Sequence, residues 1–560
     1  MTNYQKIKSA LSELSEGVIF SLEQPEEISY GDYSTNIAFP LGKKQEMYPA
    51  ECAKDVTEIL KEKLSSIVER IEVANPGFIN FYLKDEVRTQ EAFAYISEEL
   101  KLDILNAKKV ICEYTDPNPF KLFHIGHLVP NAIGESIARI YESVGATVTR
   151  VCYQGDVGMH VAATIWGIKN MGEQMPLETA TLREKVAFLG KAYTFGMEAL
   201  AESEEKKADI AIINKAIFER TDEDINKIYD LGKKWSIDYF ETIYKKLGTK
   251  FDFYIFESEV AVVGRDLVLK NIDTVFEQSE GAVVYKGEKV GLHTRVFINS
   301  ERLPTYEAKE LGNCLKKEEL VPGNDISIVV TGNEIDEYFK VIKAVLSEID
   351  KNLSDKLKHV SHGMLRLPEG KMSSRTGEVI QAEDLIEEVK ERLKDKFDSG
   401  RIQGEKREQL INDVAVSAIK YSILKIAPGK DIVFDFEKSI SFDGDSGPYL
   451  QYTHARLTQL ILKCCDAKSI TTNAEKEIEI ERLINSFANT LNKSYEENAP
   501  QHIVIHLTQL TRAFNAFYGR VRIISEANEV NKYHIDLCRT TKNIINKGLY
   551  ILGIVAPDEM

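Results

Sequence analysis

The sequence lacks any uninterrupted apolar stretch of about 18 residues, the length that a membrane-spanning helix needs. It also lacks a CxxC pair, so neither a zinc ribbon nor a disulfide framework is expected, and a reducing cytoplasm fits this cysteine usage. The first twenty residues carry acids and have no long apolar segment, which predicts an amphipathic helix and not a secretion signal. The seven cysteines are scattered, at Cys52, Cys112, Cys152, Cys314, Cys464, Cys465 and Cys538.

An excess of positive charge is also lacking, because 88 acidic residues outnumber 71 basic ones. The formal net charge of −17 argues against a protein that coats nucleic acid non-specifically. The segment 511–547 has the opposite balance, with seven basic residues against three acidic ones. Two interpretations of it stay open, a local nucleic-acid-binding face or a solvated helical face.

Changes of pattern divide the chain into parts, and 560 residues are too many for one core. We expect a small α+β domain over 1–105, an α/β domain over 106–430 and a helical domain over 431–560. In the first, helical patterns at 5–16 and 49–69 flank "GDYSTNIAFPLGK", and a strand follows in "NPGFINFYL". A long, charged helical insertion is expected at about 180–250.

The second part opens with a strand, a helix and a strand. "KKVICEYT" is a short apolar strand, the next segment repeats apolar residues at helical spacing, and "ATVTRVCYQGD" returns as a strand. This order is typical of a βαβ unit of a parallel sheet. Pro130 is expected in the first turn of the helix, and Gly145 at its end.

Two histidines flank a glycine where this helix begins, in "HIGH" at 124–127. Charged imidazoles would be unfavourable at the positive end of the helix dipole, but neutral imidazoles and free backbone N–H groups can donate to an anion. The segment therefore predicts a phosphate site, with two structural histidines as the alternative. Far downstream, "KMSS" at 371–374 lies between Gly370 and Gly377, and a lysine with hydroxyls suits a triphosphate.

Together the two motifs resemble the HIGH and KMSKS signatures of class I aminoacyl-tRNA synthetases. Within that class the chain resembles the arginyl-tRNA synthetase family over essentially its whole length. The segments that carry this resemblance are "GDYSTNIAF", "EYTDPNPFKLFHIGHL", "YQGDVG", "LPTYEAKELGN", "GPYLQYTHAR", "AFNAFY" and "LGIVAPDEM".

The resemblance implies a multidomain α/β protein, with a Rossmann-type parallel-sheet catalytic domain, a small α+β N-terminal domain and an all-helical C-terminal anticodon-binding domain. It implies an arginine–tRNA ligase, which uses ATP to form arginyl-adenylate and passes arginine to the 3′ end of tRNA(Arg). Family members generally need bound tRNA before they form the adenylate. Mg²⁺ would be held mostly by phosphates and water. No zinc and no membrane are implied, and a cytoplasmic monomer is expected.

The resemblance also assigns an ATP site. His124 and His127 would donate to the phosphates, and Gly126 would let the nucleotide approach the backbone. Within the second motif and its surroundings, the implied residues are Met364, whose backbone would meet adenine, the catalytic Lys371 that neutralises phosphate, and the hydroxyls of Ser373 and Ser374.

The second lysine of KMSKS is missing, since Ser374 stands there and Arg375 follows. Lys121 matches the lysine thought to supply the missing charge, and Arg375 is a second candidate. Either could be a surface cation instead.

Arginine recognition needs carboxylates that face a planar guanidinium. By the resemblance, Glu113 would bind the α-amino group and Asn118 the polar main-chain groups of the substrate. Tyr306 and Glu310 match the tyrosine and aspartate of "PTYxxRD", and residues four apart share one helix face. The glutamate lengthens the arm that would reach the guanidinium. Glu334 is a further candidate, with a solvated turn acid as its alternative.

The C-terminal helices would read the anticodon through aromatic and basic side chains, which stack on unpaired bases. Asn80 would contact the tRNA elbow through the N-terminal domain. Some of the C-terminal candidates must be core residues instead; they are Tyr449, Tyr452, Arg456, Phe517, Tyr518 and Arg520.

Two other functions stay in competition. A class I synthetase of the cysteine type would need zinc cysteines that the sequence lacks. A non-catalytic tRNA-binding paralogue would not need His124, His127 and Lys371, all of which are present.

Overall fold

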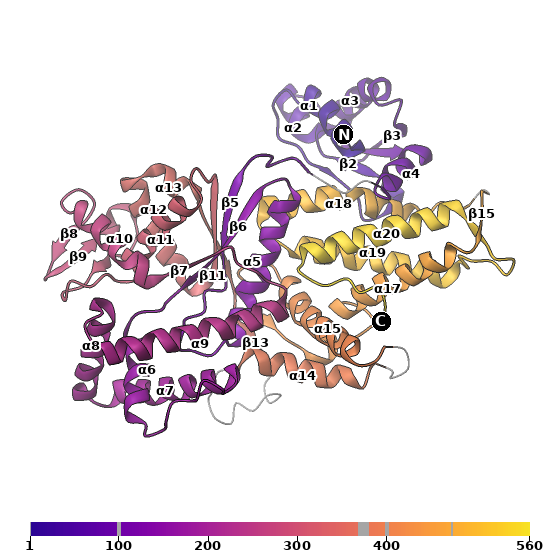
Figure 1. Ribbon diagram of the computed structural model, residues 1–560. Coiled ribbons are helices and arrows are strands. Elements are labelled where there is room, and N and C mark those ends of the chain that lie inside the picture. Colours follow the sequence, from indigo (N-terminus) through magenta and orange to yellow (C-terminus); the bar gives the residue numbers. More distant parts are fainter. Residues whose placement is uncertain (1, 98–101, 368–379, 398–401, 472–473) are drawn as a thin grey trace.

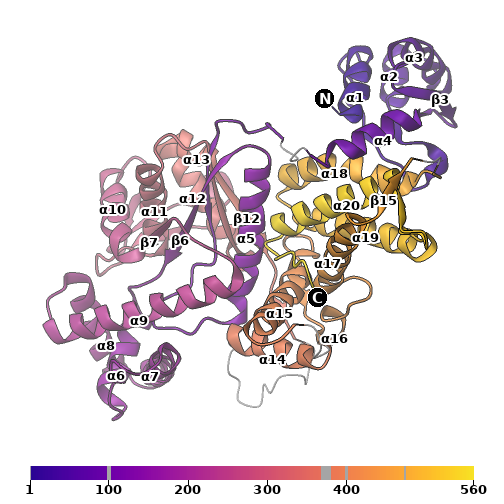
Figure 2. The same cartoon turned by 45° about the vertical axis from the view of Figure 1, so that its right-hand side comes forward.

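The computed structural model describes residues 2–97, 102–367, 380–397, 402–471 and 474–560. The predicted KMSS loop at 370–378 lies outside the described residues, and so does Arg375. The N-terminal part packs on one side of the C-terminal helices, and the parallel sheet lies on another side of them (Figures 1 and 2).

The N-terminal part is an antiparallel sheet of order β1-β2-β4-β3 with a core of its own. The helix predicted over 49–69 is too long, since α3 ends at Lys63 and the chain enters β3 at Val68. Its elements are α1 (Asn3–Leu14), β1 (Leu22–Glu23), β2 (Tyr33–Thr35), α2 (Ala38–Gln45), α3 (Pro49–Lys63), β3 (Val68–Ala74) and β4 (Phe78–Leu83). Helix α4 (Asp85–Ala94) leaves this sheet, and its buried Arg88 donates from Nε to Oε2 of Glu481 at 3.0 Å.

The central sheet has five parallel strands in the order β12-β11-β5-β6-β7. The strands are β5 (Lys109–Glu113), β6 (Thr147–Gln154), β7 (Phe253–Phe256), β11 (Ile326–Gly332) and β12 (Leu357–His362). After its first residue β5 is buried throughout, which explains its unbroken apolar sequence. Because the chain leaves β5 toward β6 and returns on the other side as β11, the carboxyl ends of β5 and β11 form the crevice where such sheets bind ligands.

Helix α5 (Ile125–Ser143) fills the space between this sheet and the C-terminal helices, and nearly all its residues from Leu128 to Tyr141 are buried (Figure 1). The expectation for Pro130 is wrong in one respect. The helix begins at Ile125, so Pro130 lies inside it and not in its first turn. Proline has no N–H, so Pro130 cannot donate to the carbonyl of Gly126 four residues earlier. Gly126 is exposed, and its carbonyl can bind water instead.

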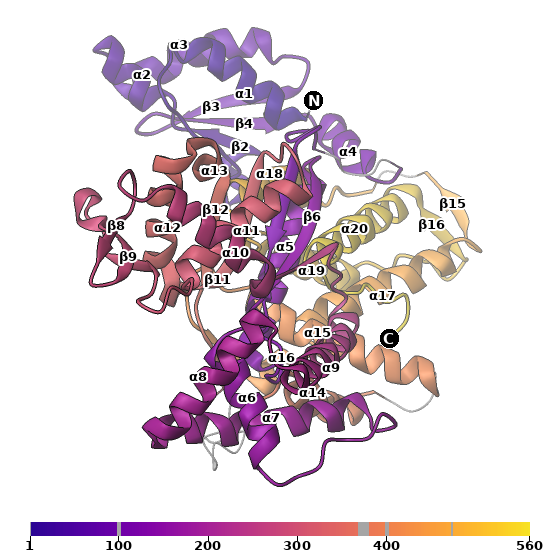
Figure 3. The same ribbon diagram turned by 60° about the vertical axis from the view of Figure 1, so that its left-hand side comes forward.

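The charged insertion forms a helical layer with its own core, made of α6 (Met159–Asn170), α7 (Leu182–Glu202), α8 (Glu204–Glu219) and α9 (Glu223–Leu247). Figure 3 shows these helices on one side of the sheet's lower end. A second small unit follows β7. It contains α10 (Glu257–Lys270), an antiparallel sheet of β8 (Glu277–Ser279), β9 (Ala282–Tyr285) and β10 (Arg295–Ile298), then α11 (Tyr306–Leu320), α12 (Asp336–Ile349) and α13 (Lys351–Lys356).

The C-terminal part is helical, as expected, and adds a short parallel ladder that the pattern did not predict, between β15 (Lys468–Ile470) and β16 (Glu529–Asn531). A second short ladder, of β13 (Leu365–Arg366) and β14 (Ile432–Val433), joins it to the central sheet region. Its helices are α14 (Ala382–Lys394), α15 (Glu405–Leu424), α16 (Phe436–Ser439), α17 (Gly447–Cys464), α18 (Ile478–Glu497), α19 (Gln501–Arg520) and α20 (Lys532–Ile551). Among the described residues, no helix combines the length and apolarity needed to cross a membrane.

Candidate active site

The two histidines cap the start of α5. The N–H of Gly126 donates to Nδ1 of His124 at 3.1 Å, and the N–H of His124 donates to Nδ1 of His127 at 3.2 Å. Because each Nδ1 accepts a hydrogen bond, each neutral ring carries its proton on Nε2. Both Nε2–H groups are therefore left to donate to a ligand.

Burial and nearby positive charge keep these rings neutral. The rings stack with centroids 3.8 Å apart. Burial lowers the pKa of His124, and the charge of Lys121 lowers it further. Burial lowers the pKa of His127 well below its usual value, with His124 and Lys121 adding to the effect. Lys121 itself lies 5.2 Å from the centre of the Tyr193 ring. The three predicted ATP-site residues thus form one electrostatic group.

Gly126 has a structural reason to be glycine that the sequence did not reveal. A Cβ at this position would lie 2.8 Å from the ring of His124. The histidine cap itself therefore excludes a side chain there, whatever the ligand does.

The segment that returns from the KMSS loop pairs with the histidine turn. The N–H of Ile125 donates to the carbonyl of Ile380 at 3.0 Å, and the N–H of Ala382 donates to that of Phe123 at 2.9 Å. His124 and Gln381 form an isolated antiparallel bridge between them. Ile380, where the described chain resumes, thus lies beside the histidine turn. Lys371, Ser373 and Ser374 are outside the described residues.

The carboxyl ends of β5, β6 and β11 open into a pocket of about 430 Å³. All five residues predicted to bind arginine line it: Glu113, Asn118, Tyr306, Glu310 and Glu334. The loop after β5 is held in an unusual conformation, with positive φ at Thr115, Asp116 and Phe120. Such backbone costs about 1–3 kcal/mol per residue and is characteristic of functional sites.

Some pocket acids already have a cation. Nζ of Lys317 donates to Glu113 at 2.8 Å, with both side chains buried, and lies 3.9 Å from Glu310. Nζ of Lys309 donates to Glu257 at 2.6 Å. At the rim, Arg295 lies 3.3 Å from Glu307.

Among the described residues, three acids of the pocket, Asp116, Glu310 and Glu334, have no cation closer than 3.9 Å. Asp116 accepts from the N–H of Tyr153 at 2.7 Å. Glu310 accepts from Nδ2 of Asn313 at 3.3 Å. Burial and the neighbouring Glu113 raise the pKa of Asp116 well above its usual value and that of Glu310 to about 7. These carboxyls suit a ligand that brings positive charge.

The sequence reasoning missed several pocket residues. Asp116 lies between Glu113 and Asn118, and Glu257 follows β7, so their positions at the carboxyl edge of a parallel sheet could have indicated them. Tyr153, near the carboxyl end of β6, follows the same rule. No comparable signal marked Arg295, Glu307 and Tyr338, which also line the pocket.

Two predicted residues have other partners in the structure. The N–H of Met364 donates to Asp431 at 2.9 Å, and its carbonyl accepts from Ile432 at 2.8 Å. Asn80 is buried in β4, where its Oδ1 accepts from the hydroxyl of Ser34 at 2.7 Å. A direct tRNA contact by the Asn80 side chain would need this bond to open.

A pocket of about 500 Å³ lies between α17, the end of α19 and the C-terminal residue. The guanidinium of Arg456 lies 4.6 Å from the ring centre of Tyr452 and 5.4 Å from that of Tyr518, and all three line this pocket. Phe517, in contrast, is fully buried. The hydroxyl of Tyr449 accepts from Asn515 at 3.0 Å.

The positive excess over 511–547 is largely paired in the structure. Arg520 pairs with Glu477, which raises its pKa. Four more cations of this segment are paired, Arg512 with Asp445, Arg522 with Glu526, and Lys532 and Arg539 with Asp536. Its role as a separate basic face is therefore weaker than the sequence indicated.

Family models match three consecutive parts of the chain. One described as tRNA synthetases class I (R), catalytic domain, matches residues 90–436, more than half of the protein. The chain belongs to the class I (R) tRNA synthetases. Models of the arginyl tRNA synthetase N terminal domain and the DALR anticodon binding domain match residues 3–83 and 450–560 of this synthetase.

Full-length relatives agree with this assignment. The synthetase is 29% identical to the arginine–tRNA ligase of Treponema denticola, over 95% of this chain and 94% of the relative. It is 27% identical to that of Flavobacterium psychrophilum, over 99% and 98%. The arginyl-tRNA synthetase structure of Thermus thermophilus shares its fold, with a TM-score of 0.82 at 23% identity, over 100% of this chain and 99% of the other. The expected fold class is thereby confirmed.

Proposed function

We propose that this chain is an arginine–tRNA ligase, in line with the names of its relatives. An oxygen of the arginine α-carboxylate attacks the α-phosphorus of ATP, pyrophosphate leaves, and arginyl-adenylate forms. A hydroxyl of the terminal ribose of tRNA(Arg) then attacks the arginyl carbonyl, and AMP leaves. The observation that carries the proposal is the acid-lined pocket at the carboxyl ends of β5 and β11, beside two neutral histidines.

Arginine would enter this pocket with its two cationic groups toward the acids. Glu113 and Asn118, at the end of β5, are assigned to the α-amino end. Tyr306 and Glu310, on the first turns of α11, are assigned to the guanidinium, with Glu334 as a further partner. Glu310 is well suited because its nearest cation in the described ranges, Lys317, is 3.9 Å away and already donates to Glu113. A bidentate pair with a guanidinium would ionise it fully.

For ATP, the Nε2–H groups of His124 and His127 are assigned to the phosphates. They would donate more strongly as charge moves onto the departing pyrophosphate. Lys121 adds a positive charge beside the histidines, and Lys371, Ser373 and Ser374 are assigned to the phosphates by the family resemblance. In the part of the chain that the structure describes, no three side chains gather into a metal site. Mg²⁺ is assigned to the substrate phosphates and water, as MgATP.

For tRNA, Arg456 between Tyr452 and Tyr518 is the favoured platform for an unpaired base. Tyr449 and Arg520 are assigned to the rim of the same surface. We divide the chain into an N-terminal domain at 1–105 that meets the tRNA elbow, a catalytic domain at 106–430 and an anticodon-binding domain at 431–560. Asn80 keeps at most an indirect role, and a cytoplasmic monomer remains the expectation.

Charging of total tRNA with labelled amino acids, supplied one at a time, tests the proposal. Arginine alone should be attached, and charging should need ATP. Charging with cysteine and not arginine would make the protein a synthetase of another specificity. Binding of tRNA without any charging would make it a non-catalytic paralogue.

A further inference from the structure

Two buried or half-buried cations hold the ends of two long helices together. Lys420, on α15, donates from Nζ to the carbonyls of Leu247 and Gly553, both at 2.7 Å. Arg139, on α5, donates to the carbonyls of Gly248 at 3.2 Å and Tyr550 at 2.8 Å. Leu247 is the last residue of α9, and Gly553 follows the end of α20. We call these two cations and four carbonyls the helix-end clamp.

The clamp is an unusual use of a lysine. Lys420 is fully buried, and its two acceptors among the residues that the structure describes are backbone carbonyls, not carboxylates. Burial lowers the pKa of Lys420 to about 7, with the charge of Arg139 adding to the effect and that of Glu135 opposing it. The negative ends of two helix dipoles face the amine, which partly offsets its burial.

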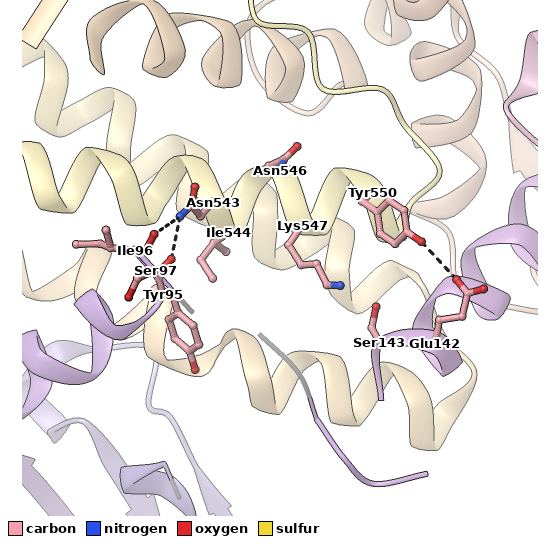
Figure 4. A pocket seen from close by; sticks show the side chains of 10 residues that line it. All are labelled: Tyr95, Ile96, Ser97, Glu142, Ser143, Asn543, Ile544, Asn546, Lys547 and Tyr550. Carbon is pink, nitrogen blue, oxygen red and sulfur yellow. Dashed lines mark hydrogen bonds between the residues drawn. The ribbon is translucent and has the colours of Figure 1, made fainter. Parts of the chain in front are cut away.

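On the α20 side of the clamp, the absence of a side chain at Gly553 leaves room for the amine of Lys420. Gly553 has φ +66°, and a Cβ on it would lie 2.8 Å from Nζ of Lys420. The end of α20 is also fixed to α5 by the hydroxyl of Tyr550, which donates to Glu142 at 3.4 Å (Figure 4). A side chain at 553 would therefore displace the amine from its carbonyls.

The other side of the clamp leads to the active-site loop. Helix α9 has 25 residues and runs from the insertion toward α15 (Figure 2). Two residues of α9 contact Phe120, whose backbone has a positive φ. The hydroxyl of Ser236 accepts from the N–H of Phe120 at 2.9 Å, and Gly232 leaves room for the Phe120 ring. Phe120 lies between Asn118 and Lys121, two residues assigned to the substrates. A shift of α9 along its axis would move this loop.

Near its other end, α9 holds the turn after β6. The hydroxyl of Tyr229 and Nζ of Lys233 both donate to Asp156, at 2.6 and 2.7 Å. Asp156 follows Gly155, whose N–H donates to Oδ1 of Asn118 at 3.2 Å. Two independent contacts of one rigid helix thus reach the same loop.

We propose that Lys420 is a positioning residue that couples the anticodon-binding helices to the substrate loop, through the helix-end clamp and α9. The proposal rests on the proposed ligase function. Lys420 touches no substrate; it fixes where α9, and with it Phe120, lies relative to α20. When tRNA binds the C-terminal helices, the clamp passes any movement of α20 to the residues around Asn118 and Lys121.

The test compares Lys420→Met with Lys406→Met, an exposed lysine of the same helix. For each variant we would measure the Kd for tRNA, the KM for arginine and the kcat of arginylation. Lys420→Met should lose at least tenfold in kcat, with the tRNA Kd within twofold of the unmodified protein. Lys406→Met should match the unmodified protein in all three.

Gly553→Ala disturbs the helix-end clamp without changing Lys420, because its added Cβ would lie 2.8 Å from the amine. If Lys420→Met does not fold, Gly553→Ala alone tests the proposal. It should lower kcat in the same selective way, and the double variant should be no worse than the poorer single one. An unchanged kcat in Lys420→Met or, where that variant does not fold, in Gly553→Ala would overturn the proposal. A kcat loss matched by an equal loss of tRNA affinity would also overturn it. If the unmodified protein does not charge arginine at all, the ligase function fails first, which separates the two results.

Discussion

The affinity for arginine should depend on pH through Glu310. Burial and the neighbouring Glu113 raise the pKa of this carboxyl to about 7 in the free protein. Below pH 7 the carboxyl is mostly protonated and neutral, and a guanidinium gains little from it. Above pH 7 it is mostly ionised, so the binding-competent form becomes the main one. Arginine binding should therefore strengthen as the pH rises.

The size of the effect follows from the ionised fraction. A carboxyl with a pKa of 7 is ionised to roughly one tenth at pH 6 and roughly nine tenths at pH 8, and apparent affinity scales with the competent fraction. The KM for arginine should thus fall about tenfold between pH 6 and pH 8. Asp116, whose pKa burial and Glu113 also raise, acts in the same direction.

The assay is pyrophosphate exchange with tRNA present, at saturating ATP and a series of pH values. Glu310→Gln should bind arginine weakly and lose most of the pH dependence, because an amide cannot ionise. Glu319→Gln, an exposed position on the same helix, should keep the full dependence. A KM that stays flat, or one that rises with pH in the unmodified protein, would refute the reasoning.

Three further predictions concern the histidines, the buried ion pair and the base platform. His127→Ala should slow adenylate formation about 100-fold, as loss of one transition-state donor does, and equal weakening of tRNA binding would contradict its role. Lys317→Met should lower the free energy of urea unfolding by about 3–5 kcal/mol, because Glu113 stays buried without its cation; a loss below about 1 kcal/mol would show that Glu113 becomes protonated or hydrated at little cost. Arg456→Ala should weaken tRNA binding about tenfold with the arginine KM unchanged, and a changed arginine KM would point to a disturbed fold instead.

The arginine-site residues Glu113, Asn118, Tyr306 and Glu310 were assigned by family resemblance, and the structure brings all four to one pocket. Asp116 and Glu257 could have been found from a physical rule, because each follows a strand at the carboxyl edge of the parallel sheet, but they were overlooked. Tyr338, on α12, and Arg295, on β10, enter the pocket through packing between distant elements, which no local pattern encodes.

The other differences have physical causes of the same kind. Asn80 was assigned to the tRNA elbow by the family resemblance alone, but β4 lies inside its sheet between β2 and β3, and Asn80 is buried there. Pro130 was expected in the first turn, but the His124 cap starts the helix at Ile125, which places Pro130 beyond that turn. The Lys420 contacts join residues more than 130 positions apart and have no signature in the sequence.

A crystal structure with arginine and a non-hydrolysable ATP analogue would examine the central idea most directly. Phosphate oxygens should lie within hydrogen-bond distance of Nε2 of both His124 and His127, while the guanidinium meets Glu310 at the inner end of the pocket. Phosphates bound elsewhere, or a guanidinium that faces solvent, would contradict the account.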